Sequence, residues 1–175
     1  IVWFKRDYRI IDNEALYSAH QSEIPLLFIC FFEPSVMSYP DSDVRHWRFI
    51  YQSIDDLNQK LNPSNSKIYL FHNEVKTVFS ELIQKYEIKT VFSHQEIGNR
   101  ITYNRDIEMI NLFQKNDISW KEFQMHGVIR KLKSRQDWDK RWEKVMRDTP
   151  KIIKESELKT IELDPEFYDS IKGKT

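Results

Sequence analysis

Short apolar runs alternate with stretches of helical periodicity along the first 123 residues. Each apolar run is four to eight residues long and rich in β-branched and aromatic side chains, which is typical of buried strands. The predicted strands are residues 1–4, 25–32, 67–71, 89–93 and 118–123. The second of them, PLLFICFF, has no polar position, so we expect it to be covered on both faces.

The segments between these runs repeat apolar residues at spacings of three or four, which predicts amphipathic helices. They cover residues 13–20, 44–61, 75–86 and 103–113, the last with Tyr103, Ile107, Ile110 and Phe113 on its buried face. Since glycine is scarce, the helices should begin at polar N-caps. The candidates for this role are Asp12-Asn13, Asp41-Ser42-Asp43, Asn73 and Gly98-Asn99.

Five strands separated by four helices predict an α/β fold, a Rossmann-like doubly wound five-stranded parallel sheet flanked by helices. We assign residues 1–126 to this domain. Residues 127–175 are interpreted as a linker and helical extension toward a partner domain. The segment 121–147 has 9 Lys and Arg against 4 Asp and Glu, and the tail after it shows little apolar periodicity. The basic segment could contact DNA phosphate or form a solvated helix face.

Composition narrows the class of protein. The 27 basic and 27 acidic residues cancel, so overall charge does not favour a nucleic-acid partner. The single cysteine, Cys30, excludes an intrachain disulfide and favours a buried thiol in a reducing compartment, which we take to be the cytoplasm. No apolar stretch approaches the roughly 20 residues of a membrane helix. Because the chain begins at Ile1 within a predicted strand, we expect that its start has been trimmed.

Common catalytic and phosphate-binding motifs are absent. Three glycines cannot build a dinucleotide or P-loop fingerprint, and the five scattered histidines include no pair at metal-ligand spacing. We therefore expect neither a catalytic residue nor a metal site. Trp47, Trp138 and Trp142 lie on helical stripes, and we interpret them as packing residues rather than a binding platform.

In a doubly wound sheet, ligands bind beyond the carboxyl ends of the strands. The turn after the first strand holds Lys5, Arg6, Asp7, Arg9 and Asp12. It could be a network of ion pairs or a loop that faces an anion, for which Arg9 is the better candidate. His94-Gln95-Glu96 lies at the end of the fourth strand. These polar residues could belong to a site, or they could be ordinary solvated loop residues or a helix cap.

Three stretches resemble the DNA photolyase/cryptochrome superfamily in order and spacing: WFKRDYRIIDNEAL at 3–16, HQEIGNRITYNRD at 94–106 and GVIRKLKSRQDWDKRWEKVM at 127–146. The resemblance implies the N-terminal antenna domain of a deoxyribodipyrimidine photolyase. It also implies a following helical domain, absent here, that binds FAD and acts on UV-damaged DNA. We expect this chain alone to be inactive.

The resemblance also implies a light-harvesting chromophore in this domain: a flavin, a deazaflavin or a folate. Candidate contacts by position are Arg9, Glu33, Glu96 and Asn99. The sequence departs from the family in two places. Tyr8 replaces the usual Leu, and the Asn-Glu pair of the folate-binding type falls on Ile101 and Thr102, which argues against folate in that mode.

Two alternatives remain at this point. A cryptochrome-like blue-light photoreceptor would share the same fold, and nothing in these residues separates it from a photolyase. A nucleotide-binding or protein-docking α/β module is the alternative of another class. The nucleotide-binding form would need a glycine-rich or HxGH phosphate loop, and the chain has neither.

Overall fold

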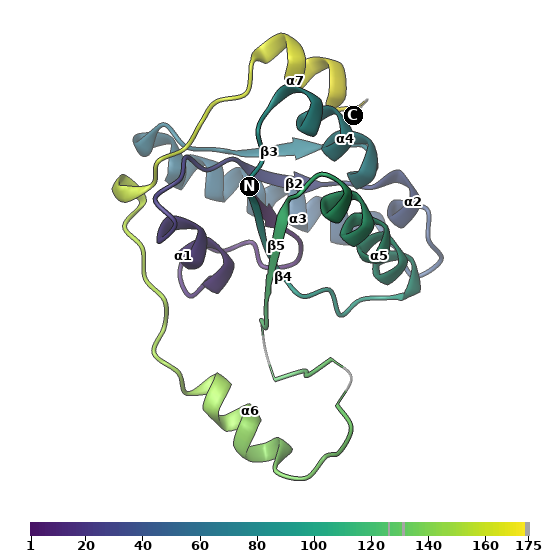
Figure 1. Ribbon diagram of the computed structural model, residues 1–175, viewed down its shortest axis with the longest axis vertical. Helices are drawn as coiled ribbons and strands as arrows, with labels where there is room; N and C mark the ends of the chain where they lie inside the picture. Colours follow the sequence, from purple (N-terminus) through teal and green to yellow (C-terminus); the bar gives the residue numbers. More distant parts are fainter. Residues whose placement is uncertain (126, 131, 174–175) are drawn as a thin grey trace.

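The sheet has five parallel strands in the order β3-β2-β1-β4-β5. The computed structural model describes residues 1–125, 127–130 and 132–173, and Figure 1 shows the sheet between its helices. The strands are β1 (Val2–Phe4), β2 (Phe28–Phe31), β3 (Ile68–Phe71), β4 (Thr90–His94) and β5 (Ser119–Phe123). All five predicted strands are present, and the α/β fold class is confirmed.

The helices follow the strands in the predicted alternation. They are α1 (Glu14–His20), α3 (Val44–Leu61), α4 (Val75–Lys85) and α5 (Arg100–Lys115), with 3-10 turns at Asn62–Ser64 and Glu155–Glu157. The short helix α2 (Pro34–Met37) was not predicted, because four residues carry no periodicity. Pro34 stands at its first position, where a missing N–H is tolerated.

Alternate strand residues supply two separate cores, as the pleat of a strand requires. Val2, Phe4 and Phe28 face α1 and α3, whereas Trp3 and Ile29 face α4 and α5. Cys30 is buried in the first core, as expected, and burial raises the pKa of its thiol to about 12. The sheet is therefore covered on both faces.

Three of the four predicted N-caps are confirmed. The side chains of Asn13, Asp43 and Asn99 accept hydrogen bonds from the first turns of α1, α3 and α5. The prediction for Asn73 is wrong, because Glu74 occupies the N-cap position of α4. The side chain of Asn73 accepts a hydrogen bond from the backbone N–H of Glu74.

Helix α5 turns a different face to the core from the one predicted. Its buried residues are Thr102, Asp106, Met109 and Phe113. Tyr103, Ile107 and Ile110 are exposed by 40–45%. The predicted and observed faces share Phe113 and diverge toward the N-terminal end. The polar Asp106 is buried because its carboxylate meets the side chain of Lys5 beneath the helix.

The tail after residue 150 packs back on the α/β domain, a contact that its weak periodicity did not predict. Leu26 N–H donates to the backbone oxygen of Lys159, and Ile161 N–H donates to the backbone oxygen of Leu26. These two hydrogen bonds form a parallel β-bridge between Leu26 and Thr160. Helix α7 (Pro165–Ile171) then lies beside α4 (Figure 1). The buried tail residues are Ile153, Leu158, Leu163 and Ile171.

Helix α6 (Trp138–Met146) lies apart from the sheet and its helices (Figure 1). None of its residues is buried, and its two tryptophan side chains contact each other at a ring distance of 6.4 Å. Trp142 also contacts Gly127, where an added Cβ would lie 1.9 Å from the indole. Lys131 of the basic segment lies outside the described residues.

Candidate functional site

A cavity of about 530 Å³ opens at the carboxyl ends of the strands. It is lined from the ends of β1 and β2, the start of α3, the loop after β4 and the first turns of α5. The strand order reverses between β1 and β4, so the cavity lies at the switch point where this architecture binds ligands.

Aromatic side chains form much of the cavity wall. Trp3 and Phe31 are buried and meet edge to face at 5.7 Å, and Trp47 meets Phe32 in the same way at 5.2 Å. Trp47 lines the cavity and is half-buried, and its indole N–H donates to Ser42 Oγ at 2.6 Å. It therefore serves both as a packing residue and as cavity wall. Aromatic walls of this kind suit a flat ligand.

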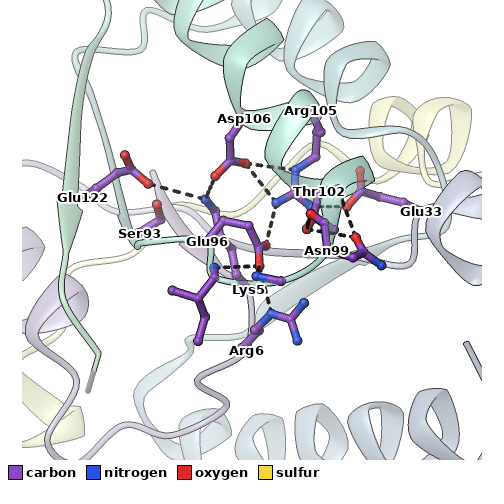
Figure 2. Close-up of polar contacts among 12 residues, drawn as sticks. Lys5, Arg6, Glu33, Ser93, Glu96, Asn99, Thr102, Arg105, Asp106 and Glu122 are labelled. Carbon is purple, nitrogen blue, oxygen red and sulfur yellow. Dashed lines mark hydrogen bonds and ion pairs between the residues drawn. The ribbon is translucent and has the colours of Figure 1, made fainter. Parts of the chain in front are cut away.

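Charged side chains line one side of the cavity, which we call its charged floor: Lys5, Arg6, Glu33, Glu96 and Arg105. Arg105 is at the centre of this floor (Figure 2). Its guanidinium contacts the carboxylates of Glu33, Glu96 and Asp106, the last two at 2.9 Å. Burial opposes its charge, but the three carboxylates outweigh that cost and raise the pKa of Arg105. Three elements are thereby joined, because Glu33 follows β2 and Glu96 follows β4.

Lys5 is the second buried cation, with only 4% of its side chain exposed. Its ammonium lies 2.9 Å from Asp106 and 4.3 Å from the centroid of the Trp3 ring. Burial lowers the pKa of Lys5, although the carboxylate of Asp106 acts in the opposite direction. The aromatic wall and the charged floor thus share Trp3, which Arg105 also approaches at 5.0 Å.

The pKa values of Glu33 and Glu96 are shifted in opposite directions. Burial raises the pKa of Glu33, with Arg105 only partly offsetting it. Burial also acts to raise the pKa of Glu96, but the cations of Arg6, Arg105 and Lys5 prevail and lower it. Glu96 is consequently the carboxylate more firmly held in its charged form.

Backbone contacts hold the loop after β4. Glu96 Oε1 accepts from the N–H groups of Ile97 and Gly98 at 3.0 and 2.7 Å, and from Arg6 Nε at 3.0 Å. Asn99 accepts from Thr102 N–H and donates to Asp41 in the loop before α3. Glu96 is only 4% exposed, so it is not an ordinary solvated loop residue.

The structure brings three of the four predicted contact residues together. Glu33, Glu96 and Asn99 line the cavity. Arg9 is not among the lining residues, and its guanidinium instead bonds the backbone oxygen and the carboxylate of Asp12. The expected ion pairs of the first turn are present, but most of them reach across to α5 and the loop after β4.

Sequence reasoning missed Arg105 and Asp106 as site residues. Their signal was the stripe Thr102, Asp106, Met109 and Phe113, which also has helical spacing and begins one turn after the N-cap Asn99. The more apolar stripe beside it concealed the pattern.

A second group of buried polar side chains is centred on Asp7 in the first turn. Asp7 bonds the side chains of His94 and Asn13, and its other oxygen, Oδ1, has no hydrogen-bond partner. His94 is 3% exposed, so it too is structural rather than solvated. This contact ties the first turn to the end of β4.

Arg130 fastens the segment after β5 to the same floor. Its Nε donates to the backbone oxygen of Glu96 at 2.8 Å, and its guanidinium pairs with Glu122 at 3.1 Å.

Across residues 1–125, 127–130 and 132–173 there is no group of three or more side chains arranged to hold a metal ion. None of the described helices has the length and apolar character needed to cross a membrane.

Fold and cavity together define a class: a doubly wound α/β domain with a cofactor-sized cavity at its switch point. Comparison with known sequences supplies the family. Residues 1–156 match the DNA photolyase family, and the chain belongs to it. The resemblance seen in the three sequence stretches is thereby confirmed.

Cryptochromes are among the sequence relatives. Cryptochrome-2 of Gallus gallus is 29% identical over 86 residues, which are 49% of this chain and 15% of that protein. A chloroplastic/mitochondrial cryptochrome DASH of Solanum lycopersicum is 28% identical over 102 residues, 55% of this chain and 18% of that protein. The chain thus spans less than a fifth of each of these two relatives.

Solved structures share the fold at low sequence identity. An archaeal photolyase from Sulfolobus tokodaii, described as having two FAD molecules that imply a novel light-harvesting cofactor, matches with a TM-score of 0.72 and 17% identity. The match covers 98% of this chain and 41% of that one. A cryptochrome of Synechocystis matches with a TM-score of 0.69 and 17% identity, covering 95% and 39%.

Proposed function

We propose that this chain is the light-harvesting domain of a photolyase, and that its cavity binds a flat conjugated chromophore. The observation that carries the proposal is the cavity at the switch point, with aromatic walls and a charged floor. Its volume of about 530 Å³ is in the range of cofactor pockets. Membership of the DNA photolyase family supports this choice over a nucleotide-binding or docking module.

The lining residues fit such a ligand. Trp3, Phe31 and Trp47 offer ring faces and edges against which a planar ring system packs. Glu33 and Asn99 place a carboxylate and an amide on the polar side of the cavity. Glu96 holds the charged floor in place, because its two oxygens already accept from Arg6, Arg105 and the loop backbone. When bound, the chromophore would absorb light and pass the excitation energy to a FAD held by a helical domain. The chain's own part is to bind it, orient it and exclude water.

A flavin or deazaflavin is the favoured ligand. A folate held by the Asn-Glu pair is disfavoured, because Ile101 and Thr102 stand at those positions. Thr102 is buried, and its hydroxyl already donates to the backbone oxygen of Asn99 at 3.0 Å. The Sulfolobus tokodaii photolyase, described with two FAD molecules and the implication of a novel light-harvesting cofactor, supports a flavin as the ligand.

Binding can be tested directly on this chain. Equilibrium dialysis with FMN, a 5-deazaflavin and a reduced folate should show binding of one of the first two. Ile50→Trp, which fills the cavity from α3, should weaken that binding by at least about tenfold. Ile107→Trp, placed on the exposed face of α5, is the matched control and should leave it unchanged. Absence of binding by all three, or equal loss in both variants, would refute the proposal.

The proposal for the whole protein is a cytoplasmic, blue-light-driven photolyase that uses FAD in its helical domain to repair UV-damaged DNA. A cryptochrome-like photoreceptor is the second candidate, supported by the cryptochrome relatives. Blue-light repair of a dimer-containing oligonucleotide by the longer polypeptide distinguishes them. Photoreduction of the flavin without loss of the lesion would favour the photoreceptor.

A further inference from the structure

Three side chains that line the cavity are oxidisable: Trp3, Tyr8 and Trp47. An excited flavin or deazaflavin is a strong one-electron oxidant, so any of the three could donate an electron and quench the excitation. Their surroundings differ, and these differences rank them as donors.

Trp3 is poorly placed to lose an electron. The Lys5 ammonium lies 4.3 Å and the Arg105 guanidinium carbon 5.0 Å from its ring centroid. Lys5 also lies 4.7 Å from Trp120, whose ring stacks on Trp3 at 5.8 Å. Cations this close destabilise the positive charge that the indole would gain on losing an electron, although the carboxylates bound to these cations reduce the effect.

Tyr8 is poorly placed for another reason. Oxidation of a phenol is favourable only when its proton can leave with the electron. The hydroxyl of Tyr8 donates to the backbone oxygen of Lys5 at 2.5 Å, and a carbonyl oxygen is not a base that accepts this proton. Burial, the largest cause, also raises the pKa of Tyr8 well above its usual value.

Trp47 meets neither obstacle. Its indole N–H donates to Ser42 Oγ at 2.6 Å, and a hydrogen bond from the N–H stabilises positive charge on the ring. Among the described residues, no cation lies over the Trp47 ring in the way that Lys5 lies over Trp3. Its nearest ring contact is the edge-to-face one with Phe32 at 5.2 Å.

We infer that Trp47, rather than Trp3 or Tyr8, is the electron donor that quenches an excited chromophore in this cavity; the inference rests on the proposed function. One electron leaves the Trp47 indole for the excited ring, and the indole becomes a radical cation whose N–H stays bonded to Ser42. The same electron then returns to Trp47, so no other reductant or oxidant is consumed and the excitation is lost as heat. The position of Trp47 would therefore set how much energy the domain can pass on.

The experiment uses FMN bound to this chain, with the amount bound measured by dialysis. Transient absorption should show a short-lived tryptophan radical, and the emission of bound FMN should decay quickly. Trp47→Phe should abolish the radical and lengthen the emission lifetime by about tenfold, the change expected when the fastest decay route is removed. Trp3→Phe should lengthen the lifetime by less than Trp47→Phe does, with the amount of bound FMN measured by dialysis for both variants. Trp138→Phe, on the remote helix α6, is the matched control.

Ser42→Ala provides a second test if Trp47→Phe does not fold. It leaves the indole in place but removes its hydrogen-bond acceptor, and it should lengthen the lifetime by about threefold. FMN binding with a lifetime unchanged in the Trp47 and Ser42 variants would overturn this inference alone. A larger effect of Trp3→Phe would overturn it as well. If FMN does not bind, the same measurements are made with the 5-deazaflavin. Failure of both to bind would overturn the proposed chromophore site together with this inference.

Discussion

At the residue scale, the partner of each charged side chain decides its role. Lys5, Arg6 and Arg9 are close together in the sequence, yet they face different surroundings. Lys5 is buried against Asp106, Arg6 reaches Glu96 with about half of its side chain exposed, and Arg9 folds back on Asp12. Only the first two belong to the floor of the cavity.

Glu96→Gln should show how this floor depends on pH. The pKa of Glu96 lies below its usual 4.5 in the folded chain. Its charge therefore contributes stability that is present above pH 4.5 and lost as the pH falls through the lowered pKa. Urea titrations should show the variant to be less stable by roughly 3 kcal/mol near neutral pH, as for removal of one partner of a buried ion pair. The difference should shrink below pH 4.5; a constant difference would contradict this assignment.

Gly98→Ala should disturb the loop after β4 through crowding. An added Cβ would lie 2.1 Å from Arg6 Nη2, 2.7 Å from Glu96 Oε1 and 2.8 Å from Thr102 Oγ1. Arg6 can swing into solvent, but Glu96 and Thr102 are buried and cannot. We expect a loss of about 1–3 kcal/mol in the free energy of unfolding, the usual result of overpacking. A variant as stable as the wild type would show that the loop adjusts freely.

At the element scale, α5 shows how one helix can carry two apolar stripes. The stripe that faces the core includes Met109, and the more apolar stripe beside it includes Ile110. The ion pair between Lys5 and Asp106 fixes the rotation of the helix, because a buried lysine needs a carboxylate partner. Site chemistry thus determines the packing of this element.

The matched pair Met109→Ala and Ile110→Ala tests this rotation of α5. Met109 is fully buried, so its truncation should reduce the free energy of unfolding by about 2–5 kcal/mol. Ile110 is 40% exposed, so its truncation should cost less than about 1 kcal/mol. Chemical denaturation measures both. Equal losses would place the buried face where the simple periodicity put it.

At the scale of the whole molecule, the tail joins two faces of the domain. Ile153 and Leu158 pack in the core beneath α1 and α3, whereas Leu163 and Ile171 pack in the core beside α4. Tyr168 donates to the backbone oxygen of Leu70 at 2.7 Å, and His72 N–H donates to Lys172. The tail thereby covers part of the edge of β3. The boundary between residues 126 and 127 stays a prediction.

A chain that ends after Pro150 should lose most of its stability. The four buried tail side chains together contribute about 6–12 kcal/mol by burial, comparable with the roughly 5–15 kcal/mol that stabilises a typical domain. Near-UV circular dichroism and hydrogen exchange should show loss of fixed packing. The control is the double variant Trp138→Ser and Trp142→Ser, which alters only exposed side chains of α6 and should stay folded. A stable shortened chain would restore the interpretation of the tail as a linker.

The amino-acid sequence by itself determined the order of the strands along the chain, the main helices between them, three N-caps and the edge of the sheet where a ligand would bind. These features are local: the period of a strand or helix and a cap need only neighbouring residues. It also placed Glu33, Glu96 and Asn99 near one another, since parallel strands end at a common edge.

Only the tertiary structure decided the rotation of α5, the place of Arg105 in the floor, the separation of Arg9 from the cavity and the return of the tail. Each depends on a contact between residues far apart in the chain, such as Lys5 with Asp106 or Leu26 with Thr160. Apolar spacing cannot reveal a buried ion pair, because the pair replaces apolar residues on the buried face. A tail that packs through isolated side chains leaves no periodic pattern to read.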